Sequence, residues 1–156
     1  MVAILLSGPV HAEEPSATSY TFTCGADTLT IESSCIFRNS QEHLTQCTKQ
    51  DVGLISGDHK SVKLPHDGKS GIREGMPPLP LLDALITSWT CANDKYILLG
   101  YTSRWYPEPT EWYRIFDLQG NDLTEGIKVT DGDAVLKLLK KLGLNPDSLK
   151  VNSFRY

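Results

Sequence analysis

The chain has 156 residues, 40% hydrophobic and 22% charged, which is enough length and apolar content for one globular domain. Fifteen basic and nineteen acidic residues give a formal net charge of −4. Nucleic-acid binding depends on clustered Lys and Arg. The densest basic group, Lys137, Lys140 and Lys141, lies among leucines, so we expect no nucleic-acid partner.

The amino-terminal segment 1–12 is apolar and ends with small residues at Val10 and Ala12, which is typical of a secretory cleavage site. No positive charge precedes the apolar run, so we expect Met1 to lie inside a longer signal peptide. A first core strand is the other interpretation. No later run approaches the ~18 apolar residues of a membrane span. We therefore expect a signal-peptide remnant at 1–12, a single β-rich domain at 13–156 that does not span a membrane, and a periplasmic or extracellular location.

Four cysteines, Cys24, Cys35, Cys47 and Cys91, follow this segment, and an even count in an exported chain favours two disulfides. Cys35 and Cys47 face each other across the loop 38–43, which leaves Cys24 for Cys91. This is the preferred connectivity of three. A zinc site is the competing interpretation, but the chain has no Cys-x-x-Cys pair. We expect no metal and no other cofactor.

Alternation of apolar and polar residues predicts an antiparallel meander. In its first hairpin we expect Cys24 to face Leu29. In a later hairpin, a two-residue turn at Asn93 and Asp94 places Trp89 and Leu98 on the same face. The predicted strands are 20–24, 29–37, 51–56, 60–64, 87–92, 95–103, 111–118 and 122–129, with a final strand in the tail 149–156.

The segment 65–80 has four prolines and three glycines, which predict an irregular surface loop; a flexible connector is the plainer interpretation. The short apolar run 81–86 fits a helical turn or a strand. One helix is predicted after the capping residues 130–133, with its apolar stripe on the sheet and Gly143 as its stop. The sequence therefore predicts an α+β fold, predominantly an antiparallel β meander with one C-terminal helix packed on the sheet and two disulfides.

Acid–base chemistry has two candidate histidines, His59 and His66, each next to an aspartate, Asp58 and Asp67. Their spacing matches no standard metal-ligand motif, and solvated surface histidines are the default interpretation. The chain also has no Gly-x-Ser-x-Gly elbow for a serine nucleophile. We therefore expect the protein not to be an enzyme, with a small periplasmic hydrolase using these groups as an alternative.

The segment 104–114 concentrates four aromatic residues, two arginines and two glutamates around two prolines. Trp, Tyr and Arg dominate interface hot spots, and prolines pre-order a loop that presents them. The other interpretation places Trp112 and Tyr113 in the next strand and Trp105 on the domain edge. The predicted partner-binding loop consists of Arg104, Trp105, Tyr106, Glu108 and Glu111.

Residues 20–31, Tyr-Thr-Phe-Thr-Cys-Gly-Ala-Asp-Thr-Leu-Thr-Ile, resemble the opening strand pair of the bacterial periplasmic C-type lysozyme inhibitors. The Ser-Gly-x-x-Tyr inhibitory motif of that family has no counterpart here, so no inhibitory residue carries over. Segments 97–101 and 113–118 are similar in style to β-rich periplasmic immunity proteins.

These resemblances imply a protein partner, either a cell-wall-degrading enzyme or a secreted effector, that is blocked by a loop. The candidate loops are 104–111 and 65–80. We therefore expect an exported binding protein, an inhibitor or immunity protein. A small hydrolase and an envelope structural or ligand-sensing module are the alternatives, and the sequence leaves the oligomeric state open.

Overall fold

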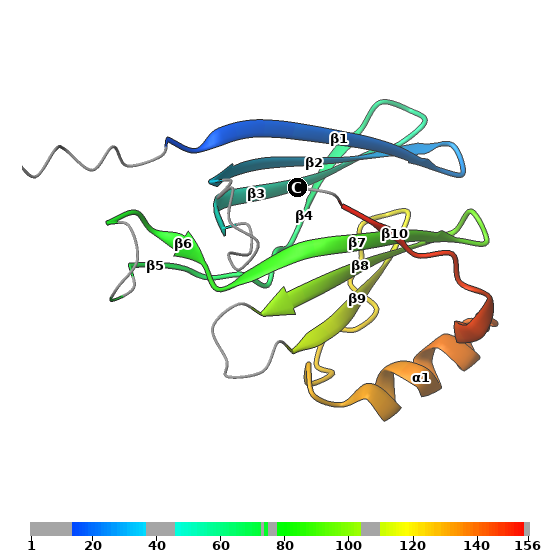
Figure 1. Cartoon of the computed structure of the whole chain (residues 1–156). Helices are drawn as coiled ribbons and strands as arrows, with labels where there is room; N and C mark the ends of the chain where they lie inside the picture. The colour runs from blue at the N-terminus through cyan, green and yellow to red at the C-terminus, as the bar shows by residue number, and fades with distance from the viewer. Residues whose placement is uncertain (1–13, 37–45, 73, 75–77, 104–109, 155–156) are drawn as a thin grey trace, which may run out of the picture.

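The computed structural model describes residues 14–36, 46–72, 74, 78–103 and 110–154, and these form two facing β-sheets with one helix outside the second sheet (Figure 1). The first sheet has the order β1-β2-β3-β4, with β1 at Ser16–Cys24, β2 at Asp27–Ile36, β3 at Gln46–Ile55 and β4 at Ser61–Leu64. The second has the order β10-β7-β8-β9, with β7 at Ala84–Ala92, β8 at Tyr96–Ser103, β9 at Glu111–Asp117 and β10 at Asn152–Ser153. A small pair joins β5 at Ser70–Gly71 to β6 at Leu81–Leu82.

The first hairpin has a tighter turn than expected. Cys24 pairs with Asp27, and Phe22 pairs with Leu29, so the expected pairing of Cys24 with Leu29 is wrong by two residues. Gly25 supports the short turn because it adopts a positive φ of 61°. Side chains alternate with a period of two, so this slip keeps the predicted inward face.

The hairpin of β7 and β8 also differs from the expectation, and here the difference changes the faces. Asn93 and Asp94 have the predicted positive φ angles of 53° and 52°, but Ala92 pairs with Tyr96 across a three-residue loop. Trp89 therefore lies opposite Leu99 rather than Leu98. A one-residue slip exchanges the two faces of a strand, which is why the predicted assignment of faces was wrong.

The main core lies between the two sheets. Phe22 of β1 stacks on Trp89 of β7 with ring centroids 4.0 Å apart, which closes the side of the sandwich where β1 lies over β7. The fully enclosed side chains come from both sheets, so neither sheet buries its inner face alone. They include Leu29, Ile31, Val52, Leu54, Leu64, Ile86, Ile97, Leu99, Tyr101 and Phe116.

A second, smaller core lies on the outer face of the second sheet, beneath helix α1 at Gly132–Lys141. Leu98 and Ile115 of the sheet pack there with Leu139 of the helix. The predicted helix and its contact with the sheet are thus confirmed. Asp131 caps the helix by accepting a hydrogen bond from the Ala134 N–H at 3.0 Å.

Three expectations about local structure need correction. The segment 122–129 forms no strand: only Asp122 makes an isolated bridge to Phe116, and turns follow it. The described tail contributes only the two-residue strand β10 after a short 3-10 turn at Pro146–Ser148. The segment 65–80, expected to be irregular, contains the two-residue strand β5. Of the two interpretations left open for 81–86, the structure has strand rather than a helical turn.

Both predicted disulfides are present, as is the predicted fold class. Cys24–Cys91 joins the two sheets across a sequence separation of 67, and Cys35–Cys47 joins neighbouring strands across a separation of 12. No helix in the described ranges is long and apolar enough to cross a membrane.

Candidate functional site

The strand ends that carry the predicted partner-binding loop lie at one end of the sandwich, on the left in Figure 1. Strand β8 ends at Ser103 and β9 begins at Glu111, and the Ser103 N–H donates to the Thr110 carbonyl oxygen at 2.9 Å. At the same end β2 finishes at Ile36, which pairs with Gln46 at the start of β3. Two longer connections of the chain, 37–45 and 104–109, therefore leave the sheets together, and we call this region the long-loop end.

The Cys35–Cys47 disulfide lies at the long-loop end and is completely buried. Leu82 and Leu85 pack against its two half-cystines and join the first sheet to β6 and β7. The disulfide thus fixes the strand ends from which 37–45 departs and ties them to the second sheet through apolar contact.

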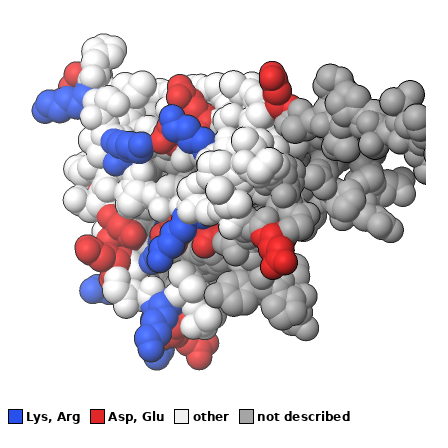
Figure 2. All heavy atoms as spheres, turned by 90° about the vertical axis from the view of Figure 1, so that its left-hand side faces the viewer, with Lys and Arg blue, Asp and Glu red and all other residues white. Residues whose placement is uncertain are grey.

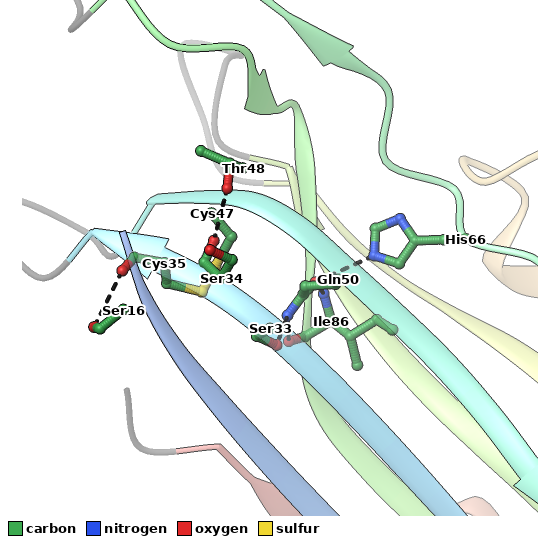
Figure 3. Close-up of a disulfide and its surroundings, with 9 residues drawn as sticks. All are labelled: Ser16, Ser33, Ser34, Cys35, Cys47, Thr48, Gln50, His66 and Ile86. Atoms are coloured by element: carbon green, nitrogen blue, oxygen red, sulfur yellow. Dashed lines mark hydrogen bonds between the residues drawn. A yellow bond between two sulfur atoms is a disulfide. The ribbon is translucent and has the colours of Figure 1, made fainter. Parts of the chain in front are cut away.

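A buried glutamine bridges the two sheets at this end. Gln50 of β3 is 5% exposed, and its amide nitrogen is 3.3 Å from the Ser33 hydroxyl and 3.4 Å from the Ile86 carbonyl oxygen (Figure 3). Its amide oxygen accepts hydrogen bonds from the Ile86 N–H at 2.8 Å and from His66 Nε2 at 3.1 Å. Both the nitrogen and the oxygen of the Gln50 amide are hydrogen-bonded. These bonds compensate for the cost of removing the amide from water.

His66 is half-buried and bonded within the protein, which corrects the expectation of a solvated surface histidine. The Gly68 N–H donates to its Nδ1 at 2.9 Å, so Nδ1 carries no proton and Nε2 is the donor toward Gln50. Burial lowers the pKa of His66 below its ordinary value. The ring stands edge-on to Tyr101 with centroids 5.3 Å apart. A neutral imidazole with both nitrogens engaged serves here as a structural bridge.

Asp67 connects the segment 65–80 to β9. Its Oδ2 accepts hydrogen bonds from Trp112 Nε1 and Arg114 Nε, both at 2.7 Å. Arg114 also donates to the Thr124 carbonyl oxygen at 3.2 Å. The two candidate loops, 65–80 and 104–111, are therefore joined at their bases by one carboxylate.

Stacked aromatic rings support this junction from inside. Trp112 stacks on Tyr101, with centroids 5.6 Å apart and ring planes 8° from parallel. Burial raises the pKa of Tyr101, and the nearby carboxylate of Asp67 acts in the same direction. Trp112 belongs to strand β9, as the alternative interpretation of the aromatic segment proposed.

Acidic and basic side chains are interspersed over the described part of the long-loop end (Figure 2). No patch of a single sign covers it in this view. Recognition by large-scale charge steering therefore has no basis on the described part of this face.

Of the predicted partner-binding loop, Glu111 is described and lies exposed at the start of β9. Arg104, Trp105, Tyr106 and Glu108 lie outside the described residues, as does the signal-peptide remnant 1–12. The loop's base is therefore defined at Glu111 and in the contacts of Trp112 and Arg114.

The histidines of the alternative hydrolase are not brought together. His59 lies exposed in the turn before β4, with a positive φ of 65°, and His66 follows β4 at its other end. Asp58 is engaged by Ser56 and Lys60 in that turn. Within the described residues, no three His, Cys, Asp or Glu side chains are grouped so as to hold a metal ion.

Sequence reasoning missed the junction of Gln50, His66, Asp67 and Arg114. Its signals were weak: a glutamine next to the predicted strand 51–56, and an arginine in the aromatic segment whose acidic partner lies 47 positions away in the sequence. Comparison with models of protein families, with curated proteins and with solved structures finds no match to this chain. The function is therefore argued from its own residues.

Proposed function

We propose that this protein is an exported binding protein, an inhibitor or immunity protein, that occludes a partner enzyme with the loops of its long-loop end. The observation that carries the proposal is the junction at Asp67, which bonds Trp112 and Arg114 and so fixes 65–80 to the base of 104–111. Binding residues concentrate on loops that a rigid scaffold positions. Two candidate loops with a common base would present one composite surface to a partner.

The rigidity of that base supports the proposal energetically. Binding orders loops and side chains at a cost, and a pre-organised loop loses less freedom on association. Here the base has a buried disulfide, a fully bonded glutamine and a stacked Tyr101–Trp112 pair. These features favour recognition of a folded partner over capture of a flexible peptide.

Location in an oxidising compartment is part of the proposal. Both disulfides are formed and the described residues leave no free cysteine, a pattern of proteins that mature outside the cytoplasm. A partner enzyme that acts on the cell wall, or one delivered by a competitor, would meet the protein there.

The alternative hydrolase has less support. General acid–base catalysis needs its groups within hydrogen-bonding reach of one substrate. His59 and His66 flank opposite ends of β4, and both nitrogens of His66 are already bonded. The composite loop surface is therefore the better basis for a function.

The test is affinity capture from envelope extract with the oxidised mature protein, compared with Trp105→Ala/Tyr106→Ala and Glu111→Lys. We expect one protein in stoichiometric amount, lost with the double variant and reduced with the charge reversal. Asp94→Ala/Lys95→Ala, in the turn at the opposite end of the second sheet, is the matched control and should capture as well as wild type. The captured enzyme should lose activity on addition of one equivalent of the inhibitor.

Two outcomes would contradict the proposal. One is the absence of a stoichiometric partner for wild type. The other is a partner whose capture is unaffected by the loop variants but reduced by the control variant, because binding would then occur at the wrong end of the molecule.

A further inference from the structure

The outer face of the second sheet is only partly covered by α1, and the uncovered part is hollowed. A cavity of about 320 Å³ lies between the helix and the sheet, and a second of about 440 Å³ lies beside it over β7, β8 and β9. The two share four lining residues: Glu111, Trp112, Tyr113 and Val151. They are therefore parts of one hollow, which we call the outer groove.

The part of the outer groove next to the helix is apolar. Tyr113, Val129, Leu136 and Val151 line it while remaining 37% to 48% exposed. They make up four of the seven large apolar side chains that are exposed among the described residues. Exposed apolar side chains that gather in one place mark a binding site, whereas scattered ones need no explanation.

Gly132, at the start of α1, lines this apolar part of the groove. A Cβ atom built there meets nothing within 4 Å, although the residue stands in the first turn of α1. A side chain added at Gly132 would therefore meet no clash at its Cβ atom and would occupy space at the edge of the groove.

The other part of the groove has hydroxyl groups and a flat base. Ser88 and Ser153 line it, and Gly100 lies beneath the Ser88 hydroxyl, so close that a Cβ at position 100 would overlap it. Tyr113 stands at the boundary between the two parts. Hydroxyls that both donate and accept suit a ligand that also carries hydroxyls, and an aromatic ring suits the apolar face of such a ligand.

Charge restricts the ligand further. Among the residues that the structure describes, Glu111 is the one charged side chain that lines either part of the groove. None of the lysines and arginines that the structure describes lines it, so an anionic head group would gain no ion pair from them and would meet the Glu111 carboxylate instead. The lining therefore disfavours fatty acids and phosphate-bearing lipids, and it accepts an uncharged head.

We propose that the outer groove binds a small amphiphile with an uncharged, hydroxylated, sugar-like head and a short alkyl chain. The chain would lie among Val129, Leu136 and Val151, and the head would face Ser88, Ser153 and Glu111. A pocket of a few hundred Å³ that is largely apolar with a few convergent polar groups has the usual form of a small-ligand site. The groove shares Glu111 with the loop surface proposed above, but the proposal for the groove does not rest on that function.

The experiment is isothermal titration with octyl glucoside below its micellar concentration, on the full oxidised protein. We expect saturable one-to-one binding, and about tenfold weaker binding of hexyl glucoside because two methylenes fewer are buried. Glucose alone should bind undetectably. Octanoate should bind at least tenfold more weakly than octyl glucoside because of its charge.

The variant that tests the position is Gly132→Phe, which fills the apolar part and should abolish binding. Ile55→Phe is its control: it also adds an exposed phenylalanine, but at the end of β3 on the other sheet. Circular dichroism and the melting temperature verify that both variants fold.

Three results would overturn the proposal: no saturable binding of octyl glucoside, unchanged binding by a folded Gly132→Phe variant, or octanoate bound as tightly as octyl glucoside. If Gly132→Phe fails to fold, Tyr113→Ser replaces it, and tenfold weaker binding is again the required result. None of these readouts depends on the partner capture described above.

Discussion

At one end of the two sheets the chain reverses in short turns, whereas at the other end its connections are long. At the short-turn end backbone lies directly on backbone: a Cβ at Gly25 would approach the Asp94 carbonyl oxygen to 2.8 Å. The Gly57 N–H donates to the Asp27 carboxylate at 3.0 Å, which joins the turn before β4 to the β1–β2 turn. The close approach of backbone at Gly25 leaves no room for a side chain there.

The long-loop end is held by side chains instead. Gln50, Asp67 and Arg114 bond groups on several segments, and each could be replaced only together with its partners. An end organised in this way can carry loops of different length and composition on a constant base. The two ends of the molecule therefore differ in role: the short-turn end closes the sandwich, and the long-loop end presents the loops.

The largest expected effect compares the disulfides of the two ends. Replacing Cys24 and Cys91 by alanine should lower the free energy of unfolding by about 4 kcal/mol, and replacing Cys35 and Cys47 by about 3 kcal/mol, since the longer closed loop restricts the unfolded chain more. Urea unfolding of the two double variants measures both. A larger loss at the long-loop end would show that its disulfide contributes more than chain entropy.

The next effect concerns the junction itself. Asp67→Ala leaves Arg114, whose side chain is 17% exposed, and the Trp112 N–H without their acceptor. We expect a loss of about 2–3 kcal/mol, an amount typical of a half-buried charged hydrogen-bond network. Asp51→Ala, which breaks ion pairs with two exposed lysines, should cost about 0–1 kcal/mol in the same urea titration. Equal losses would mean that the junction is no stronger than a surface ion pair.

A smaller effect tests whether the segment 65–80 is packed or merely a connector. A Cβ at Gly68 would lie 2.3 Å from the Ala84 carbonyl oxygen, whereas one at Gly71 meets nothing within 4 Å. Gly68→Ala should therefore destabilise by about 1–3 kcal/mol through overpacking, and Gly71→Ala by less than about 0.5 kcal/mol. Thermal melts of the pair decide the question, and indistinguishable melting temperatures would support a loose connector.

The smallest effect is a pH dependence at the long-loop end. Burial lowers the pKa of His66 in the folded protein, so below about pH 6.5 the unfolded chain binds more protons than the folded one. Stability is unaffected by this group above that pH and falls as the pH drops below it, with a slope of at most about 1.4 kcal/mol per pH unit for one proton. Urea midpoints of wild type and His66→Gln between pH 7 and 5 should converge toward low pH. If the urea midpoints of the two proteins change in parallel with pH, a group other than His66 is responsible for the pH dependence.

Most strands, the helix and the disulfide pairing agree with what the local sequence pattern predicted. The period-two alternation identified most strands, and the even cysteine count with hairpin geometry led to the correct pairing of Cys35 with Cys47 and Cys24 with Cys91. The capping residues and Gly143 located the helix, since helix ends depend on nearby backbone groups. A two-residue error in the first hairpin did no harm, because it returns each side chain to the same face.

The sequence pattern could not decide two kinds of property. One depends on the exact length of a turn, and the other depends on contacts between segments that are distant in sequence. The loop after Ala92 has three residues instead of two, and this exchanged the faces assigned to Trp89 and Leu98. His66 was expected to be solvated because its neighbours are turn-forming residues, yet it is half-buried and both ring nitrogens are bonded to Gln50 and Gly68. Asp67 lies 47 positions from Arg114, a contact with no local signal.

The sequence by itself determined the class of fold and the capped helix, because these depend on spacing along the chain. It favoured one of three cysteine pairings, and the structure has that pairing. The tertiary structure alone decided that 65–80 and 104–111 have a common base at Asp67, and that the outer face carries a groove. The physical reason is the same for both: side-chain hydrogen bonds and uncovered surface arise between elements, and their geometry exists only once the sheets and the helix have packed.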